Sequence, residues 1–248
     1  MSAPAVKSLA HKACPSQVLI SAVDRRGSDA SIPRAHRAVP TGRRTVPVVL
    51  LAEGLRQAGF AAAHTTLDVP LDASFLLDEV ALVLSGDPVP FPDYGPALLR
   101  YEVAASDVGR RGCRFDMTVL DPAGTTVATG HALTRWLRPA QYAAVRREHP
   151  TTTIRRMAEG DVAWDLDDPF LFDHPVDHVP GMLFVAAAEE RADGAQNGTL
   201  RGGVFRGGLW TFPRFAELDA PIVVEPDGAG LAFRQRDERV AAFLPADG

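Results

Sequence analysis

The residues best suited to chemistry lie in one segment, Phe170–Met182, which reads FLFDHPVDHVPGM. It holds two histidines, His174 and His178, and two aspartates, Asp173 and Asp177. Histidine can act as an acid or a base near neutral pH, because its ordinary pKa is about 6.5. Prolines fix φ, and a Pro-Gly pair closes the turn, so the segment predicts a rigid loop that feeds a buried helix. Ionisable side chains at the mouth of an apolar helix indicate a site rather than packing.

A metal centre is one alternative for these four side chains. The prolines prevent the helix that would place an i, i+4 histidine pair on one face, and no third ligand cluster is evident in the sequence. We therefore expect neither a metal nor a cofactor. A second alternative is that one histidine only satisfies backbone groups in the turn, which suits His178 better than His174. Nucleophile elbows, phosphate-binding glycine loops and dinucleotide fingerprints are absent from the sequence.

A second group of polar residues lies on a predicted helix from Pro47 to about His64. Its near-continuous apolar character predicts burial on most sides, and it carries Glu53 and Arg56 one turn apart. Because burial disfavours charge, we expect a raised pKa for this carboxylate. A structural salt bridge between the two side chains is the alternative to a catalytic role.

Composition excludes several functional classes. Apolar residues make up 46% of the 248 residues, charged residues make up 23%, and the net charge is −5. These values are typical of a globular protein with a full core, and they argue against a general nucleic-acid binder. Cys14 and Cys113 form neither a metal spacing nor a disulfide framework. With no signal-peptide pattern and no run of about 20 apolar residues, we expect a soluble, cytoplasmic protein without a membrane partner.

Hydrophobic periodicity predicts one order of elements twice. In the first half, a strand, a long Arg-rich loop and the buried helix precede a series of period-two strands. The predicted segments are strand Gln17–Val23, loop Arg25–Arg44, and strands Ala73–Ser85, Ala97–Ala105, Cys113–Leu120 and Thr125–Leu137. In the second half, a helix at Val179–Ala192 precedes four strands, with another strand suggested at Val162–Leu166. Those four strands are expected at Leu209–Leu218, Pro221–Pro226, Ala229–Arg236 and Arg239–Leu244.

This repetition predicts an internally duplicated α+β protein, in which each half is a long buried helix wrapped by an antiparallel sheet. We expect a flexible leader at residues 1–15, a first repeat at residues 16–148 and a second repeat at residues 149–248.

A helix wrapped by a sheet, duplicated in tandem, resembles a double hotdog fold. The segments FDHPVDHVPGML, from Phe172, and FPRFAELDAP, from Phe212, resemble the second repeat of the A-factor biosynthesis (AfsA-type) hotdog family. PRAHR, from Pro33, and LLAEGLRQAG, from Leu50, resemble the first repeat of that family. The resemblance spans nearly the whole chain from about residue 30.

The resemblance implies transfer of a β-ketoacyl group from a carrier-protein or coenzyme A thioester to a hydroxyl of dihydroxyacetone phosphate. Such a reaction belongs to the biosynthesis of γ-butyrolactone or butenolide signals. Each family repeat usually carries a Glu-x-x-Arg-Gln segment on its helix. The first repeat keeps it as Glu53, Arg56 and Gln57, whereas the second has Ala186, Glu189 and Glu190 in its place.

In hotdog dehydratases, a loop histidine of one subunit faces a helix carboxylate of the other. Applied to two fused halves, this similarity joins His174, together with His178, to Glu53. The other combination joins His36 to Ala186 and lacks a carboxylate, so we predict one working site. The expected substrate-binding groups are Arg34, His36, Arg56, Gln57, Asp173, Asp177 and the backbone N–H groups around Gly181 and Met182.

Two other functions remain open on the sequence. The same site would serve a dehydratase or thioesterase acting on an acyl thioester. Alternatively, loss of the second Glu-x-x-Arg leaves a non-catalytic module that binds acyl ligands or a carrier. The expected partners are an acyl-carrier protein or acyl-CoA and a small phosphorylated acceptor, with the chain acting as a monomeric pseudo-dimer or a homodimer.

Overall fold

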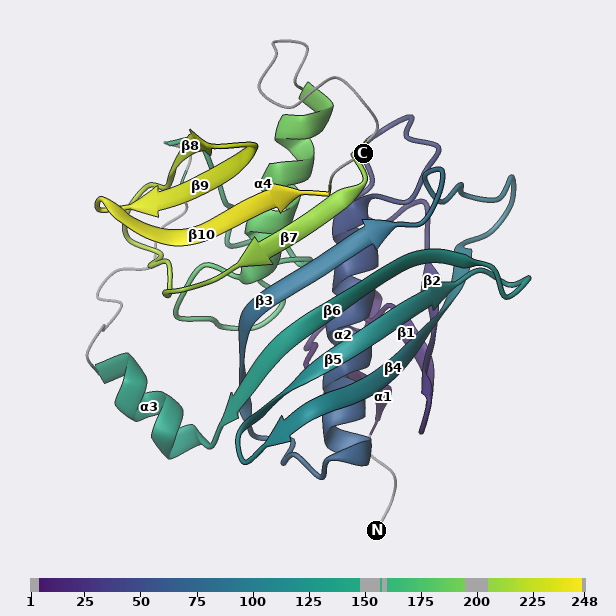
Figure 1. Ribbon diagram of the computed structural model, residues 1–248, viewed down its shortest axis with the longest axis horizontal. Coiled ribbons are helices and arrows are strands. Elements are labelled where there is room, and N and C mark those ends of the chain that lie inside the picture. The colour runs from purple at the N-terminus through teal and green to yellow at the C-terminus, as the bar shows by residue number, and fades with distance from the viewer. Residues whose placement is uncertain (1–4, 148–156, 158–159, 195–204, 247–248) are drawn as a thin grey trace.

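The computed structural model describes residues 5–147, 157, 160–194 and 205–246. Within them, one antiparallel sheet has the strand order β1-β2-β4-β5-β6-β3-β7-β10-β9-β8 and curves around two helices (Figure 1). The strands are β1 (Ile20–Asp24), β2 (Gly27–Ile32), β3 (Ser74–Leu84), β4 (Ala97–Gly109), β5 (Gly112–Leu120), β6 (Thr126–Leu137), β7 (Gly207–Thr211), β8 (Val223–Asp227), β9 (Gly230–Gln235) and β10 (Glu238–Pro245). The α-helices are α1 (Val6–Leu9), α2 (Val48–Thr66), α3 (Pro139–Arg147) and α4 (Gly181–Gly194).

Helix α2 is the core of the first half, as its apolar sequence predicts. Pro47 precedes the first turn of the helix, where the missing N–H of a proline costs nothing. Nearly all side chains of α2 are buried. Gly54 lies in its middle, where glycine costs about 1 kcal/mol relative to alanine. A Cβ there would meet the Tyr101 hydroxyl of β4 at 2.3 Å, so glycine is what allows α2 to approach the sheet. That hydroxyl donates to the Leu51 carbonyl at 3.1 Å.

The two halves share the sheet and their helices touch. Strand β3 of the first half pairs with β7 of the second, with Val80 opposite Trp210, and both residues are buried. Helix α4 lies behind β7, β9 and β10 (Figure 1), and its Phe184 packs edge-on against Phe233 of β9 at 5.1 Å. The predicted boundary between residues 148 and 149 lies outside the described residues.

The structure corrects several sequence predictions. The predicted loop at Arg25–Arg44 contains β2, which pairs with both β1 and β4. Residues 162–166 form no strand, only an isolated bridge between Trp164 and Met157. Strand β7 ends at Thr211 rather than near residue 218, and α3 was not predicted. These differences share a cause. Short segments with weak hydrophobic periodicity become strands or helices only where another part of the chain pairs with them or packs against them.

The segment expected to be a flexible leader is part of the fold where the structure describes it. Helix α1 packs on α2, and Leu9, Ala10 and Lys12 are buried. Helix α1 also contacts β1, so residues 6–12 pack as part of the first half.

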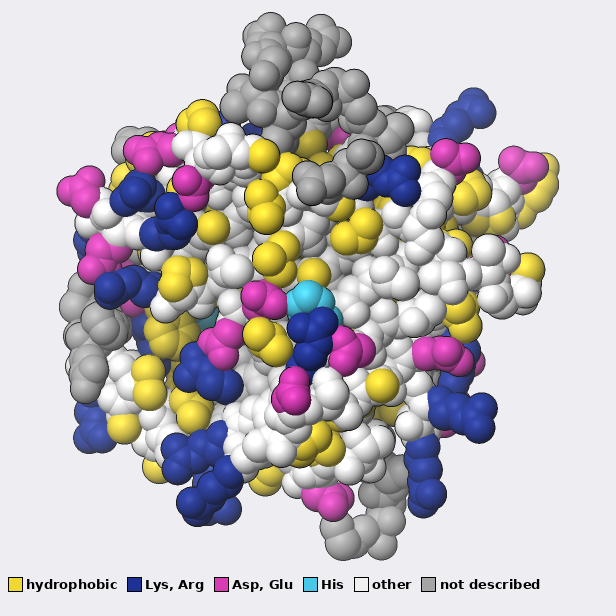
Figure 2. All heavy atoms as spheres, in the orientation of Figure 1, with side chains coloured by type: hydrophobic (Ala, Val, Ile, Leu, Met, Phe, Trp, Pro, Cys, Tyr) yellow, Lys and Arg dark blue, Asp and Glu magenta, His cyan; other side chains and the backbone are white. Residues whose placement is uncertain are grey.

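Two observations concern the surface. On the face of the sheet seen in Figure 2, acidic and basic side chains are interspersed with small apolar spots. Among the described residues, none of the helices is long and apolar enough to cross a membrane.

Glu189 of α4 connects the second half to the start of α2. Its Oε1 accepts the Val48 N–H at 3.0 Å and its Oε2 accepts the Val49 N–H at 2.9 Å. Arg43 donates to the same carboxylate at 2.6 Å. The first N–H groups of a helix lack internal partners and carry partial positive charge, so a carboxylate there stabilises the helix. Burial raises the pKa of Glu189, and Arg43 acts in the opposite direction.

We expect Glu189→Gln to destabilise the fold by about 1–3 kcal/mol, because the amide cannot replace the charge paired with Arg43 or accept through both atoms. Urea unfolding at pH 7 would measure the change. The neighbouring Glu190 is exposed, so Glu190→Gln is the matched control and should leave the unfolding midpoint unchanged. Equal midpoints for the two variants would contradict the capping role.

Candidate active site

A cavity of about 790 Å³ lies where α2, the Phe170–Met182 loop and the ends of β3 and β7 meet. Its volume is in the range of small-molecule sites. Aromatic and aliphatic side chains cover much of its wall: Phe60, Phe75, Leu77, Phe170, Met182, Phe184, Phe212 and Phe215. Its ionisable residues are His11, Lys12, Glu53, Arg56, Asp78, Arg135, Tyr142, Asp173, His174, Asp177, His178 and Arg214.

Glu53 is enclosed by the protein, with 1% of its side chain exposed. Arg56 donates to both carboxylate oxygens, through Nε at 2.8 Å and Nη2 at 2.7 Å. Gln57 donates to Oε1 at 2.8 Å, and the Lys12 ammonium lies 3.4 Å from the same oxygen. Burial alone would raise the pKa of Glu53, but Arg56 and Lys12 outweigh it and lower the pKa to about 2. The expectation of a raised pKa for this carboxylate is therefore wrong.

Asp173 and His174 form the first aspartate–histidine pair of the loop. His174 Nδ1 lies 2.7 Å from Asp173 Oδ1, and the aspartate side chain is 1% exposed whereas that of His174 is 46% exposed. Burial would raise the pKa of Asp173, but His174 and Lys12 lower it below its ordinary value. An ionised carboxylate can only accept, so Nδ1 of a neutral His174 must carry the proton. Nε2 then keeps its lone pair and can accept a proton.

Asp177 and His178 form the second pair, with His178 Nδ1 2.8 Å from Asp177 Oδ1. Helix α3 fixes this pair from outside the loop. The Tyr142 hydroxyl donates to Asp177 Oδ1 at 2.6 Å, and Arg146 Nε donates to Oδ2 at 3.0 Å. Burial would raise the pKa of Asp177, but hydrogen bonds from His178 and Tyr142 lower it below its ordinary value. The unpredicted helix therefore serves the site directly.

The N-terminus of α4 completes one wall of the cavity. Gly181 and Met182 line it, and the loop end is tied to the sheet by the Val179 N–H, which donates to the Ala216 carbonyl at 2.8 Å. N–H groups in a first helical turn point outward with partial positive charge. They can donate to an oxygen that becomes negative during a reaction.

The structure brings most of the predicted site residues together. Glu53, Arg56, both aspartates, both histidines, Gly181 and Met182 all line the cavity. Arg34, His36 and Gln57 do not line it. Arg34 is exposed and donates to the Pro92 carbonyl, and Gln57 is held by Glu53 and by backbone groups near Leu19.

His36 is buried edge-on against Phe170, with ring centroids 5.2 Å apart. Burial lowers its pKa, while Glu53 acts in the opposite direction and Lys12 adds to the lowering. His36 thus lies close enough to Glu53 and Lys12 for their charges to act on its ring.

Lys12, His11 and Tyr142 line the cavity, but they were not predicted from the sequence as site residues. One signal pointed to Lys12, since the chain has only two lysines and many arginines. The sequence held no comparable signal for the others, because their partners are more than thirty residues away. Within the described part of the chain, no three of the His, Cys, Asp and Glu side chains converge as a metal ion would require.

A sheet curved around two central helices, with a cavity between a helix and a loop of the opposite half, defines a hotdog-fold protein. The model of a family described as "A-factor biosynthesis hotdog domain" (AfsA) matches residues 2–138, more than half of the chain. The chain belongs to this family, and the predicted α+β hotdog architecture is confirmed.

Two Streptomyces proteins are similar to this protein over most of its chain. A protein of Streptomyces virginiae named "2-oxo-3-(phosphooxy)propyl 3-oxoalkanoate synthase" is 26% identical over 92% of this chain and 88% of its own length. A protein of the same name from Streptomyces coelicolor is 31% identical over 82% of this chain and 73% of its own length.

Two solved structures support the fold over about nine tenths of the chain. An acyl-ACP thioesterase from Bacteroides thetaiotaomicron has a TM-score of 0.55 at 12% identity, covering 90% of this chain and 99% of that one. The 12:0-ACP thioesterase from Umbellularia californica has a TM-score of 0.52 at 16% identity, covering 91% of this chain and 100% of that one. At such identities the likeness concerns the fold alone.

We expect His174→Gln to lower turnover of an acyl thioester by about 10²–10⁴, the usual loss when a general base is removed. Steady-state kinetics would measure it, with circular dichroism to establish folding. His131 is hydrogen bonded to Glu79 at 2.6 Å and does not line the cavity, so His131→Gln is the matched control and should keep its activity. A larger loss in His178→Gln than in His174→Gln would reverse the assignment of the base.

Proposed function

We propose that this protein is an acyltransferase that moves a 3-oxoacyl group from a thioester to the hydroxyl of a small phosphorylated acceptor such as dihydroxyacetone phosphate. The observation that carries the proposal is one cavity that holds an apolar wall, two aspartate–histidine pairs and the cationic groups Lys12 and Arg56. The relatives' name describes the product of this reaction, an ester of a 3-oxoalkanoate with a 2-oxo-3-(phosphooxy)propyl group.

In the proposed reaction, His174 is the base. Its Nε2 accepts the proton of the acceptor hydroxyl as that oxygen attacks the thioester carbonyl. The oxyanion that forms accepts hydrogen bonds from the N–H groups at the start of α4, around Gly181 and Met182. When the carbon–sulfur bond breaks, the thiolate takes the proton from His174, which leaves an ester and a free thiol. Asp173 holds the imidazole orientation throughout and stabilises its charged form.

Glu53 has a different role from the one that the sequence suggests. A carboxylate whose pKa is about 2 is a poor base at neutral pH. We assign it instead to holding Arg56, whose pKa is raised because Glu53 outweighs the effect of burial. Within the described chain, Arg56 Nη1 has no acceptor, so this nitrogen is available to a polar group of the substrate.

The acceptor phosphate needs a cation that is not already neutralised. Among the arginines that line the cavity, Arg135 is bound to Asp78 by two short hydrogen bonds. Arg214 is 57% exposed, and its charged partner Glu238 lies 3.3 Å away in a solvated position. A solvated pair contributes little, so Arg214 can exchange its partner for a phosphate at small cost. We therefore place the phosphate near Arg214 and the hydroxyl near His174.

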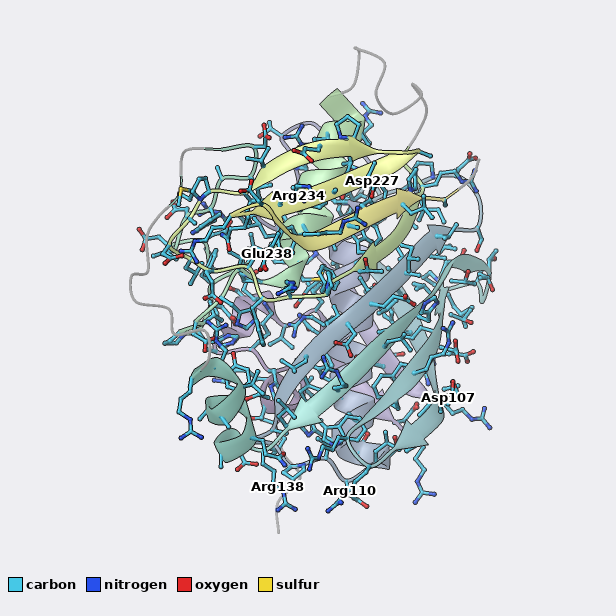
Figure 3. The ribbon with its side chains drawn as sticks, turned by 60° about the vertical axis from the view of Figure 1, so that its left-hand side comes forward. Asp107, Arg110, Arg138, Asp227, Arg234 and Glu238 are labelled. Carbon is cyan, nitrogen blue, oxygen red and sulfur yellow. The ribbon has the colours of Figure 1, made fainter. Side chains whose placement is uncertain are left out.

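The thioester donor has room on the apolar side of the cavity, where Phe60 and Phe75 stack at 4.2 Å. Exposed Arg110 and Arg138 both point into solvent at the end of the sheet next to α3 (Figure 3). Positive charge at this place favours a donor on an anionic carrier, which we propose to be an acyl-carrier protein or coenzyme A. Because one chain supplies both the helix and the loop, the site needs no second copy, and we propose a working monomer.

Mass spectrometry tests the function. The protein is incubated with a 3-oxoacyl thioester, with and without dihydroxyacetone phosphate. We expect a phosphate-containing ester only when the acceptor is present. Free 3-oxo acid in both reactions would instead support a thioesterase, an enoyl product from a 3-hydroxyacyl thioester would support a dehydratase, and no conversion would support a binding module.

Kinetics of two arginine variants locate the phosphate in the same assay. Arg214→Gln should raise the KM for the acceptor about tenfold, with little change in the KM for the thioester. Arg236 is equally exposed, at 57%, and is paired with Asp219 away from the cavity, so Arg236→Gln is the control. Equal KM values for both variants would contradict the placement of the phosphate.

A further inference from the structure

The segment Ala5–Cys14, called the strap here, lies against α2 and reaches the cavity with its last residues. It carries both lysines of the chain. Lys7 is exposed, whereas Lys12 is buried to 8% exposure. A buried ammonium is costly unless several acceptors surround it, so the position of Lys12 calls for an explanation.

Lys12 joins elements that are far apart in the sequence. Its Nζ donates to the Phe170 carbonyl at 2.9 Å, at the start of the loop. The same nitrogen lies 3.4 Å from Glu53 Oε1 and 3.8 Å from Asp173 Oδ1. One cation therefore lies between the carboxylate of the first-half helix and the carboxylate of the second-half loop.

The strap also holds the other oxygen of Asp173. The backbone N–H groups of Ala13 and Cys14 donate to Oδ2 at 2.9 and 3.3 Å. With Oδ2 occupied by the strap, Oδ1 is directed to His174 Nδ1 at 2.7 Å. The orientation of the imidazole thus depends on the strap through a single carboxylate.

A histidine pair fastens the strap to the end of α2. His11 and His64 stack with centroids 5.0 Å apart, and their Nε2 atoms are 2.8 Å apart. His64 Nδ1 lies 2.7 Å from the Val69 carbonyl, so it is the donor and its Nε2 accepts from His11. Burial, together with His64, lowers the pKa of His11 to about 4, which keeps this bond between neutral rings at pH 7.

We infer that the strap is a positioning element of the active site, in which Lys12 and the Ala13 and Cys14 amides fix Asp173 and, through it, His174. Lys12 does not itself transfer a proton in this scheme. Its ammonium neutralises two carboxylates that face each other across the halves, so that Asp173 can hold the histidine. The kinetic consequence rests on the proposed function, whereas the contact between strap and Asp173 does not.

Kinetics of lysine variants test the positioning role. Lys12→Met keeps the length of the side chain and removes its charge, and should lower kcat/KM by up to about 100-fold, the loss expected when a catalytic group is displaced. The loss should fall on kcat, with the KM for the thioester little changed, because the base is displaced while the apolar wall of the cavity is intact. Lys7→Met, the matched control, should leave both unchanged, and Lys12→Arg should restore most of the rate. A folded Lys12→Met variant that keeps the kcat of the unchanged protein would overturn the inference.

A double-mutant cycle shows whether Lys12 acts through Asp173. Residues that act as one unit are not additive, so Lys12→Met should cost little more in an Asp173→Asn background. Additive losses would overturn the inference.

Amide hydrogen exchange tests the contact without any substrate. In the full chain, Asp173→Asn should speed exchange at Ala13 and Cys14, and unchanged exchange would count against the strap. If exchange speeds up while no acyl transfer is detected, the strap contact stands and the proposed function fails, so the two failures are distinguishable.

Discussion

The buried carboxylate of Glu53 is the constraint on which the site depends. A charge with 1% exposure is tolerated only when it is paired and hydrogen bonded on every side. Arg56 and Gln57 come from the same helix, and Lys12 comes from the strap. Because Lys12 also contacts the loop at Phe170, the requirement to neutralise Glu53 brings helix, strap and loop to one place. Removal of Arg56 or of Lys12 would leave negative charge in the core without its full compensation.

The duplicated halves have diverged around this cluster. The helix position that holds Arg56 in the first half corresponds to Glu189 in the second. There the carboxylate accepts the first N–H groups of α2, so the second helix supports the first helix. The loop histidines come from the second half and the helix carboxylate from the first. This division agrees with our proposal of one composite site, in which the position of Ala186 needs no carboxylate.

The sequence predicted those elements whose structure follows from the pattern of residues within the element itself. Helix α2 and strands β3 to β6 follow from apolar periodicity, and the loop with His174 and His178 follows from its prolines. Lys12, Tyr142 and α3 could not be predicted, because their roles arise from contacts between distant segments. The ionisation of Glu53 was predicted in the wrong direction for a related reason. The helix pattern predicted that Glu53 is buried, but the second cation beside it, Lys12, lies 41 residues earlier in the chain.

The most direct test of this account is the titration of Glu53 itself. In protein labelled at the glutamate δ-carbon, the Glu53 resonance, assigned by its absence in Glu53→Gln, would be followed by NMR against pH. If Glu53 is ionised at neutral pH, its titration midpoint should lie at about 2, and its chemical shift should stay constant over the pH range in which the enzyme works. A midpoint near about 6 or above would make Glu53 an acid–base group and contradict the assignment of that role to His174.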